Sequence, residues 1–149
     1  MNQVKVGLLP LYLELYDKTS PQNRKDVEVF AGDIAARLES RGLQVTAAPV
    51  CRLKEEFTLA GRLFEEKDVA AVITLHLAYS PSLESADMLA GLKVPVLVLD
   101  TTPDFCFLPD GRAITSNHGI HGVQDMCNLL RRNGKSFFIG KTILRSVRF

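Results

Sequence analysis

The stretch Val69-Ala-Ala-Val-Ile-Thr-Leu75 is apolar at every position except Thr74. A short apolar run without polar alternation is typical of a parallel strand that is covered on both faces. The rest of the chain alternates similar runs with segments of helical periodicity. Strands are expected at residues 4–9, 43–50, 69–75, 94–99 and 136–140, and helices at residues 20–42, 54–66, 80–91 and 119–134.

Each expected helix shows one apolar stripe at spacings of three and four, as a helix packed on a sheet requires. The first stripe consists of Val27, Phe30, Ile34 and Leu38, and the second of Phe57, Leu59, Ala60, Leu63 and Phe64. Ser20 and Pro21 are expected to cap the first helix and to occupy its first turn.

Strict alternation of strand and helix predicts an α/β fold with parallel strands and right-handed crossovers. Five strands in a chain of this length indicate a doubly wound, flavodoxin-like (Rossmann-like) three-layer sandwich with strand order 2-1-3-4-5. We expect one domain at residues 1–140, followed by a C-terminal tail or the start of a linker at residues 141–149.

The composition fits one compact domain, with 149 residues, 46% hydrophobic and 23% charged side chains. A net charge of +1 gives no general attraction to nucleic acid or to a membrane, and no targeting segment is expected at the N-terminus. The bases after Arg131 suit a helix C-terminus and a solvated tail, with a nucleic-acid patch as the minor alternative. Cys51, Cys106 and Cys127 lack C-x-x-C spacing, which favours reduced thiols in a cytoplasmic protein.

In this type of sheet, ligands bind outside the carboxyl ends of the strands, where the strand order reverses. The loops expected there are residues 10–19, 76–80 and 100–118, and together with the start of the last helix they carry all three histidines. These are His76, His118 and His121. Tyr79 lies in the same region and would either stack on a ligand or cover the end of the sheet.

His118 and His121 are three residues apart where a polar loop meets a helix. Direct hydrogen bonding to a polar ligand is favoured over metal binding, because only Asp125 follows at a suitable spacing and no H-E-x-x-H pattern is present. Gly119 and Gly122 would let a ligand or a neighbouring chain approach the backbone closely.

Other functional classes lack their motifs. There is no G-x-G-x-x-G after a strand, no phosphate-binding G-x-x-x-x-G-K-[ST] loop and no G-x-S-x-G nucleophile turn. Cys106 lies between two phenylalanines and is expected to pack as a small apolar group.

With these residues, the chain resembles the N-terminal domain of the L-fucose and L-arabinose isomerase family, which are metal-dependent aldose–ketose isomerases. The resemblance extends over nearly the whole chain. It rests on Leu75-His76 followed by Ser80-Pro81, on Leu108-Pro109, on Asn117-His-Gly-Ile-His-Gly122, and on Phe137-Phe-Ile-Gly140.

The resemblance implies that this domain contributes side chains to a sugar pocket of a neighbouring subunit in a homo-oligomer. The residues carried over are His121 and His118, with Tyr12 or Leu13 from the first loop. The divalent metal, usually manganese, and the carboxylates that move the proton would belong to later domains. No catalytic residue, metal ligand or cofactor is therefore assigned to this chain, and the isolated chain is expected to be inactive and to self-associate through apolar patches.

Two differences from the family pattern leave the identity of the preferred sugar open. His118 stands where arabinose isomerases carry glutamine, and the loop at Leu77-Ala-Tyr79 is one residue longer than their pattern. The alternatives are a free-standing sugar-binding or regulatory module without catalysis, and a flavodoxin-like nucleotide binder.

Overall fold

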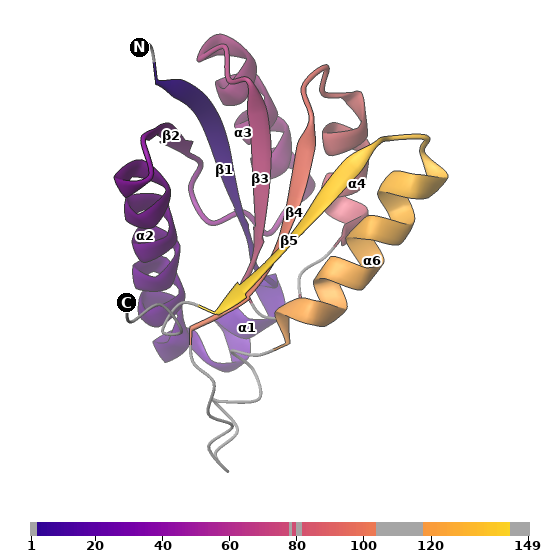
Figure 1. Cartoon of the computed structure of the whole chain (residues 1–149). Helices are drawn as coiled ribbons and strands as arrows, with labels where there is room; N and C mark the ends of the chain where they lie inside the picture. The colour runs from indigo at the N-terminus through magenta and orange to yellow at the C-terminus, as the bar shows by residue number, and fades with distance from the viewer. Residues whose placement is uncertain (1–2, 78, 80–81, 104–117, 144–149) are drawn as a thin grey trace.

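The computed structural model of the chain describes residues 3–77, 79, 82–103 and 118–143. They form a five-stranded, all-parallel sheet with strand order β2-β1-β3-β4-β5 (Figure 1). The strands are β1 (Val4–Leu11), β2 (Leu43–Ala47), β3 (Ala71–His76), β4 (Val96–Thr102) and β5 (Phe137–Ile143). The predicted fold class and strand order are thus confirmed.

Helices cover both faces of the sheet and give three layers. They are α1 (Glu14–Thr19), the 3-10 turn η1 (Pro21–Asn23), α2 (Arg24–Ser40), α3 (Lys54–Glu66), α4 (Ser82–Gly91) and α6 (Gly119–Arg132). In Figure 1, α2 packs on one face, α3, α4 and α6 lie on the other, and α1 lies near the carboxyl ends of the strands. The sequence predicts the ligand-binding site at this edge of the sheet.

The central strand β3 contributes to two apolar cores because its side chains alternate between the faces. Val72 packs in the core under α3, α4 and α6, whereas Ile73 and Leu75 pack in the core under α2. All three side chains are at most 4% exposed. The prediction that this strand is covered on both faces is therefore confirmed.

The first strand and the loop after it differ from the prediction. β1 continues through Pro10 to Leu11, because the carbonyl of Pro10 accepts a hydrogen bond from the N–H of Cys51 at 2.9 Å and needs no donor from the proline. Part of the expected loop folds into α1. Ser20 makes no side-chain cap, and the next helix begins with the 3-10 turn before α2.

Other boundaries shift by a few residues. β4 begins at Val96 and extends to Thr102, and β5 extends to Ile143, so residues 141–143 of the expected tail belong to the sheet. Within α3, Phe57, Ala60 and Phe64 are buried as predicted. Leu59 is 62% exposed, so its assignment to the buried face was wrong.

No helix in the described part of the chain is long and apolar enough to cross a membrane.

Candidate functional site

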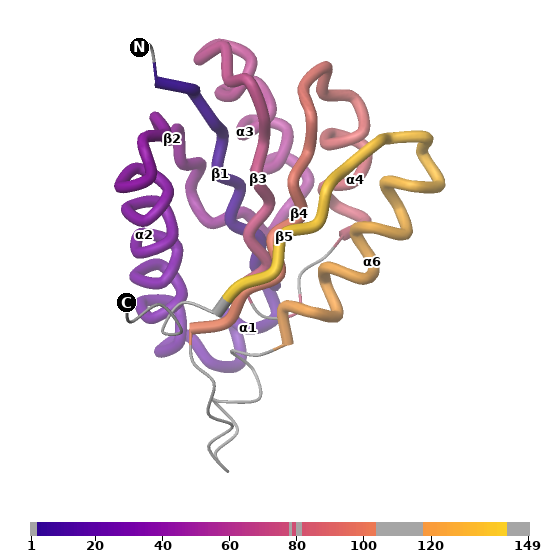
Figure 2. The backbone as a smooth tube through the Cα atoms, in the orientation of Figure 1, coloured from indigo at the N-terminus to yellow at the C-terminus, as the bar shows by residue number. Residues whose placement is uncertain are grey.

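The start of α6 packs directly on the carboxyl end of β3 (Figure 2). A Cβ built on Gly119 would lie 2.6 Å from the carbonyl oxygen of His76, closer than real contacts of this kind. Glycine is therefore the residue that lets the helix start reach the strand. The buried hydroxyl of Ser82, at the start of α4, donates to the carbonyl of Gly122 at 3.2 Å and fixes the two helices together.

His118 and His121 form a contact pair at this helix start, as their spacing predicted. Their rings are 5.4 Å apart between centroids and meet edge to face at 89°. The backbone N–H of His121 donates to the carbonyl of His118 at 3.1 Å. His118 is partly buried and His121 is exposed, so imidazole nitrogens are presented at the ligand edge of the sheet.

The third histidine lies beneath this edge. His76 is 2% exposed, and its Nε2 is 3.2 Å from the hydroxyl of Thr74. Burial lowers the pKa of His76 to about 3, so the ring is neutral near pH 7. The sequence predicts that this ring faces a ligand. The structure instead buries it, and the backbone carbonyl of His76 supports Gly119.

Tyr79 lies beside α6 and is tied to it. Its hydroxyl donates to Oδ2 of Asp125 at 3.1 Å, and this hydrogen bond is the main cause that raises the pKa of Tyr79. The side chain remains 38% exposed. Both residues line a cavity of about 370 Å³ between the start of α4 and the middle of α6. Tyr79 is therefore partly ordered by Asp125 and partly open to solvent.

Tyr12 and Leu13 lie elsewhere at the carboxyl ends. Tyr12 is fully buried in the core under α2, on the opposite face of the sheet from α6. The guanidinium of Arg24 lies 5.8 Å from its ring centroid, and burial is the main cause that raises the pKa of Tyr12. Its hydroxyl makes no hydrogen bond to the described residues. Leu13 is partly buried, and its carbonyl accepts from the N–H of Tyr16. Within this chain, neither residue joins the histidine pair.

An ion-pair network that the sequence reasoning missed occupies this second region. Arg52 donates to Asp17 and to Glu56, each at 2.6 Å, and Arg24 donates to Asp17 at 3.1 Å. Partial burial would raise the pKa of Glu56, but hydrogen bonds from Arg52 and from the N–H of Leu53 outweigh it and lower that pKa. Glu56 is the third residue of α3, but the residue before the helix is Leu53, which lacks the hydroxyl or carboxylate of a capping box, and nothing in the spacing links Asp17 to Arg52.

The cysteines in the described part of the chain are free and carry no visible chemistry. Burial raises the pKa of Cys51 to about 12, which keeps the thiol protonated and inert. Cys127 is partly buried on α6, and burial raises its pKa as well. Cys106 lies outside the described residues, as do Ser80, Pro81 and the segment 104–117 that contains Leu108, Pro109 and Asn117.

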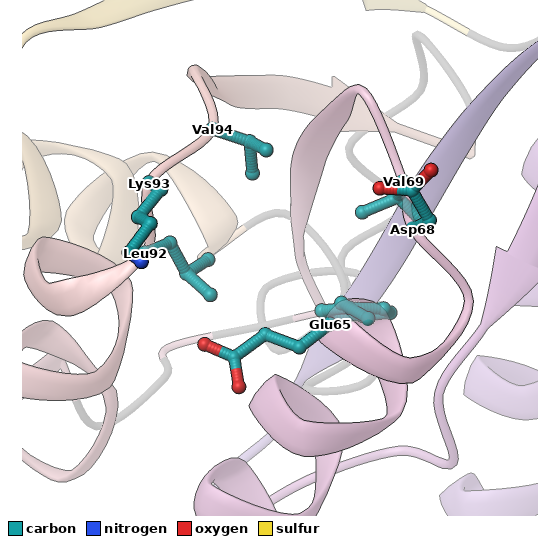
Figure 3. Close-up of a pocket in the computed structure, with 7 residues that line it drawn as sticks. Glu65, Asp68, Val69, Leu92, Lys93 and Val94 are labelled. Atoms are coloured by element: carbon teal, nitrogen blue, oxygen red, sulfur yellow. The ribbon is translucent and has the colours of Figure 1, made fainter.

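A second cavity of about 350 Å³ lies at the opposite edge, near the amino ends of β3 and β4 (Figure 3). Glu65 and Asp68 line one side, and Leu92 and Lys93 line the other. It contains none of the predicted site residues and lies away from the edge at which ligands bind in this architecture. We therefore keep the candidate site at the start of α6.

Among the described residues, no group of three or more His, Cys, Asp or Glu side chains is placed to hold a metal ion. The histidine pair has only Asp125 nearby in sequence, and that carboxylate already accepts from Tyr79.

No protein-family model matches the chain, and the comparison with curated proteins finds no match. The geometry of the site is thus the basis for the functional argument.

Proposed function

We propose that this chain is the N-terminal, substrate-contributing and oligomerising domain of a cytoplasmic aldose–ketose isomerase of the L-fucose/L-arabinose type. His118 and His121 would hydrogen-bond hydroxyl groups of a sugar whose remaining contacts come from a neighbouring subunit. The observation that carries the proposal is the histidine pair, held at the ligand edge of the sheet by the contact between Gly119 and the carbonyl of His76.

The chemistry of the pair suits a polyhydroxylated ligand. A neutral imidazole offers one donor and one acceptor, which matches a hydroxyl group that also donates and accepts. The exposed His121 is open to a molecule outside this chain, while the partly buried His118 is restrained at the helix start. Two restrained rings at fixed separation orient a ligand better than two mobile side chains.

Tyr12 and Leu13 would take part through the other side of the same edge. Since Tyr12 lies on the opposite face of the sheet from α6, it would serve a different pocket of the assembly from the one that His121 serves. Its buried hydroxyl has hydrogen-bonding capacity that the described residues do not use.

In this proposal later domains would hold the divalent metal, usually manganese, which would supply Lewis-acid chemistry when bound. The residues of this chain bind and orient the sugar and carry no proton-transfer role. Strong manganese-dependent turnover by the 149-residue chain alone would contradict this division.

The test is kinetic and uses the enzyme that contains this domain. Replacing His121 with alanine removes a ligand contact, so we expect kcat/KM for the preferred sugar to fall about tenfold or more. Replacing Lys25, an exposed residue of α2, with alanine is the matched control and should leave kcat/KM unchanged. Equal kinetics for both variants would refute the assignment of His121.

The alternative is a free-standing sugar-binding or regulatory module. The cavity between α4 and α6 favours it, because its lining combines apolar side chains with a few polar groups, as small-molecule sites do. The coding sequence downstream of Phe149 separates the two. Several hundred further codons with Glu, Asp and His ligands support the isomerase, and a stop codon supports the module.

A further inference from the structure

The cavity between the start of α4 and the middle of α6 combines two kinds of surface. Leu83 and Leu129 provide apolar walls, and Leu83 is 76% exposed. Glu84, Asp125 and Asn128 provide polar groups on the same lining. A concave site with apolar walls and a few convergent polar groups is the usual form of a small-molecule site.

The walls of this cavity are fixed without a ligand. The buried Ser82 hydroxyl ties α4 to the Gly122 carbonyl of α6, and the Ser85 hydroxyl donates back to the Ser82 carbonyl at 3.3 Å. At the rim, the Tyr79 hydroxyl is held by Asp125 at 3.1 Å. The cost of ordering the site on binding is thereby reduced.

The polar groups of the cavity keep unused hydrogen-bonding capacity. The Tyr79 hydroxyl bonds to only one oxygen of Asp125, and neither Asp125 nor Glu84 forms an ion pair with the described residues. Carboxylate oxygens accept hydrogen bonds from hydroxyl groups, and the Asn128 amide both donates and accepts. These groups match a ligand that is rich in hydroxyls.

The exposed part of Tyr79 and the neighbouring leucines match the other side of such a ligand. A sugar in its ring form presents C–H groups on its faces and hydroxyls around its rim, so it pairs an apolar face with polar edges. Tyrosine offers a rigid apolar ring with a polar tip, which suits that division. An open-chain sugar has no comparable flat face.

On α6, the nearest lining residue of the cavity, Asp125, lies four positions after His121. His121, Asp125 and Asn128 are spaced at i, i+4 and i+7 and therefore share one face of the helix. We propose that the cavity between α4 and α6 is a binding subsite for the cyclic form of a monosaccharide, adjacent to the histidine pair. The inference rests on the proposed function for its ligand class, but it requires no second subunit.

The experiment is a titration of the 149-residue chain, observed through its backbone amide resonances in nuclear magnetic resonance spectra. The probe is L-fucose, which is cyclic in solution, and the comparison ligand is its acyclic alditol. We expect saturable shifts at residues 82–84 and 125–129 with the cyclic sugar and much smaller shifts with the alditol. The same spectra report whether each variant is folded.

Variants assign the effect to the cavity. Asp125→Asn removes a charged acceptor and should weaken sugar binding about tenfold. Asp87→Asn, on α4 but outside the cavity lining, is the matched control and should bind as the unmodified chain does. Equal affinities for the two variants would overturn the proposal.

Four other outcomes also count against it. Equal shifts with the alditol would contradict selection of the ring form, and shifts that appear with ethylammonium but not with L-fucose would identify a site for organic cations. Shifts confined to residues 118–121 would show that the sugar does not bind in the cavity. They would not contradict the proposed function. An absence of shifts with any probe would overturn the subsite, while the kinetics of His121→Ala in the full enzyme would still test the proposed function separately.

Discussion

The carboxyl edge of the sheet contains two polar regions that use their side chains differently. In the first, beside β1 and β2, Asp17, Arg24, Arg52 and Glu56 are bonded to one another. In the second, at the start of α6, His118 and His121 contact each other and remain partly or fully accessible. We call them the ion-pair region and the histidine region.

The difference shows how one architecture separates stability from recognition. The charges of the ion-pair region lie at 20–29% side-chain exposure and bind α1 to the starts of α2 and α3. The histidine region is positioned by a backbone contact, in which Gly119 lies against the carbonyl of His76. Its imidazole rings are therefore not needed to hold the structure together. Substitutions in the two regions should therefore produce different phenotypes.

The largest expected effect concerns the buried His76 under the histidine region. Its pKa is about 3 in the folded chain and about 6.5 in the unfolded chain, so the unfolded chain takes up the proton first as the pH falls. Stability is therefore highest above pH 6.5 and is lost below it at up to about 1.4 kcal/mol per pH unit. Urea unfolding between pH 7 and pH 4.5 should show a loss of roughly 2–3 kcal/mol.

Two variants locate that pH dependence. His76→Gln cannot take up the proton and should flatten the slope between pH 6.5 and pH 4.5, whereas His121→Ala should retain it because His121 is exposed. The same slope in His76→Gln as in the unmodified chain would mean that another group is responsible. The effect is distinct from that of Glu56, whose lowered pKa preserves stability above the normal carboxyl range and loses it at more acidic pH.

A smaller effect is expected where α6 meets β3. Gly119→Ala would place a Cβ 2.6 Å from a backbone oxygen that cannot move freely, so we expect a loss of about 1–3 kcal/mol. Gly32→Ala in the middle of α2 meets no atom within 4 Å and should stabilise the chain by about 0.5–1 kcal/mol. Chemical denaturation of both variants measures the difference in their free energies of unfolding. Equal values would mean that the close contact of Gly119 has no effect on stability.

The ion-pair region should respond to loss of its shared cation. Arg52→Ala leaves two partly buried carboxylates without their strongest donor, and we expect a loss of about 1–2 kcal/mol after allowing for solvent screening. Lys54→Ala is the control, because its contact with Asp87 is long at 4.0 Å and exposed. If Arg52→Ala were as stable as Lys54→Ala, the network would have no structural role.

The smallest effect on stability is expected for His121→Ala. The ring is exposed and alanine is a good helix former, so the free energy of unfolding should change by no more than about 0.5 kcal/mol. In the full enzyme the variant should nevertheless lower kcat/KM for the sugar about tenfold or more. A large loss of stability would show that His121 has a structural role. It would contradict the claim that only the ion-pair region stabilises the fold.

Much of the fold could be predicted because it depends on local patterns. The apolar run at residues 69–75 identified the central strand, and the bounds of α3 at Lys54–Glu66 were predicted without error. The strand order was suggested by five strands in a chain of this length, although periodicity cannot itself fix the order of the strands. Leu59 was misplaced because a short apolar stripe does not show where the sheet surface ends.

The site was predicted less completely because it depends on which groups become buried. The spacing of His118 and His121 predicted that they share one face of the helix start, but the burial of His76 and the approach of Gly119 to its carbonyl, 43 positions away in the sequence, could not be predicted from local spacing. The link between Asp17 and Arg52 crosses 35 positions and two loops. Alternation of strands and helices places such residues at one edge without showing which of them will pair.

The most direct test of the account follows the three histidine rings during a titration of the chain with a cyclic sugar, through their carbon-bound proton resonances. We expect the resonances of His121 and His118 to shift with a common dissociation constant, while those of the buried His76 do not shift. Unchanged resonances for His118 and His121 at saturation of any observed binding, or an equal shift of all three rings, would contradict the claim that the histidine region recognises the sugar.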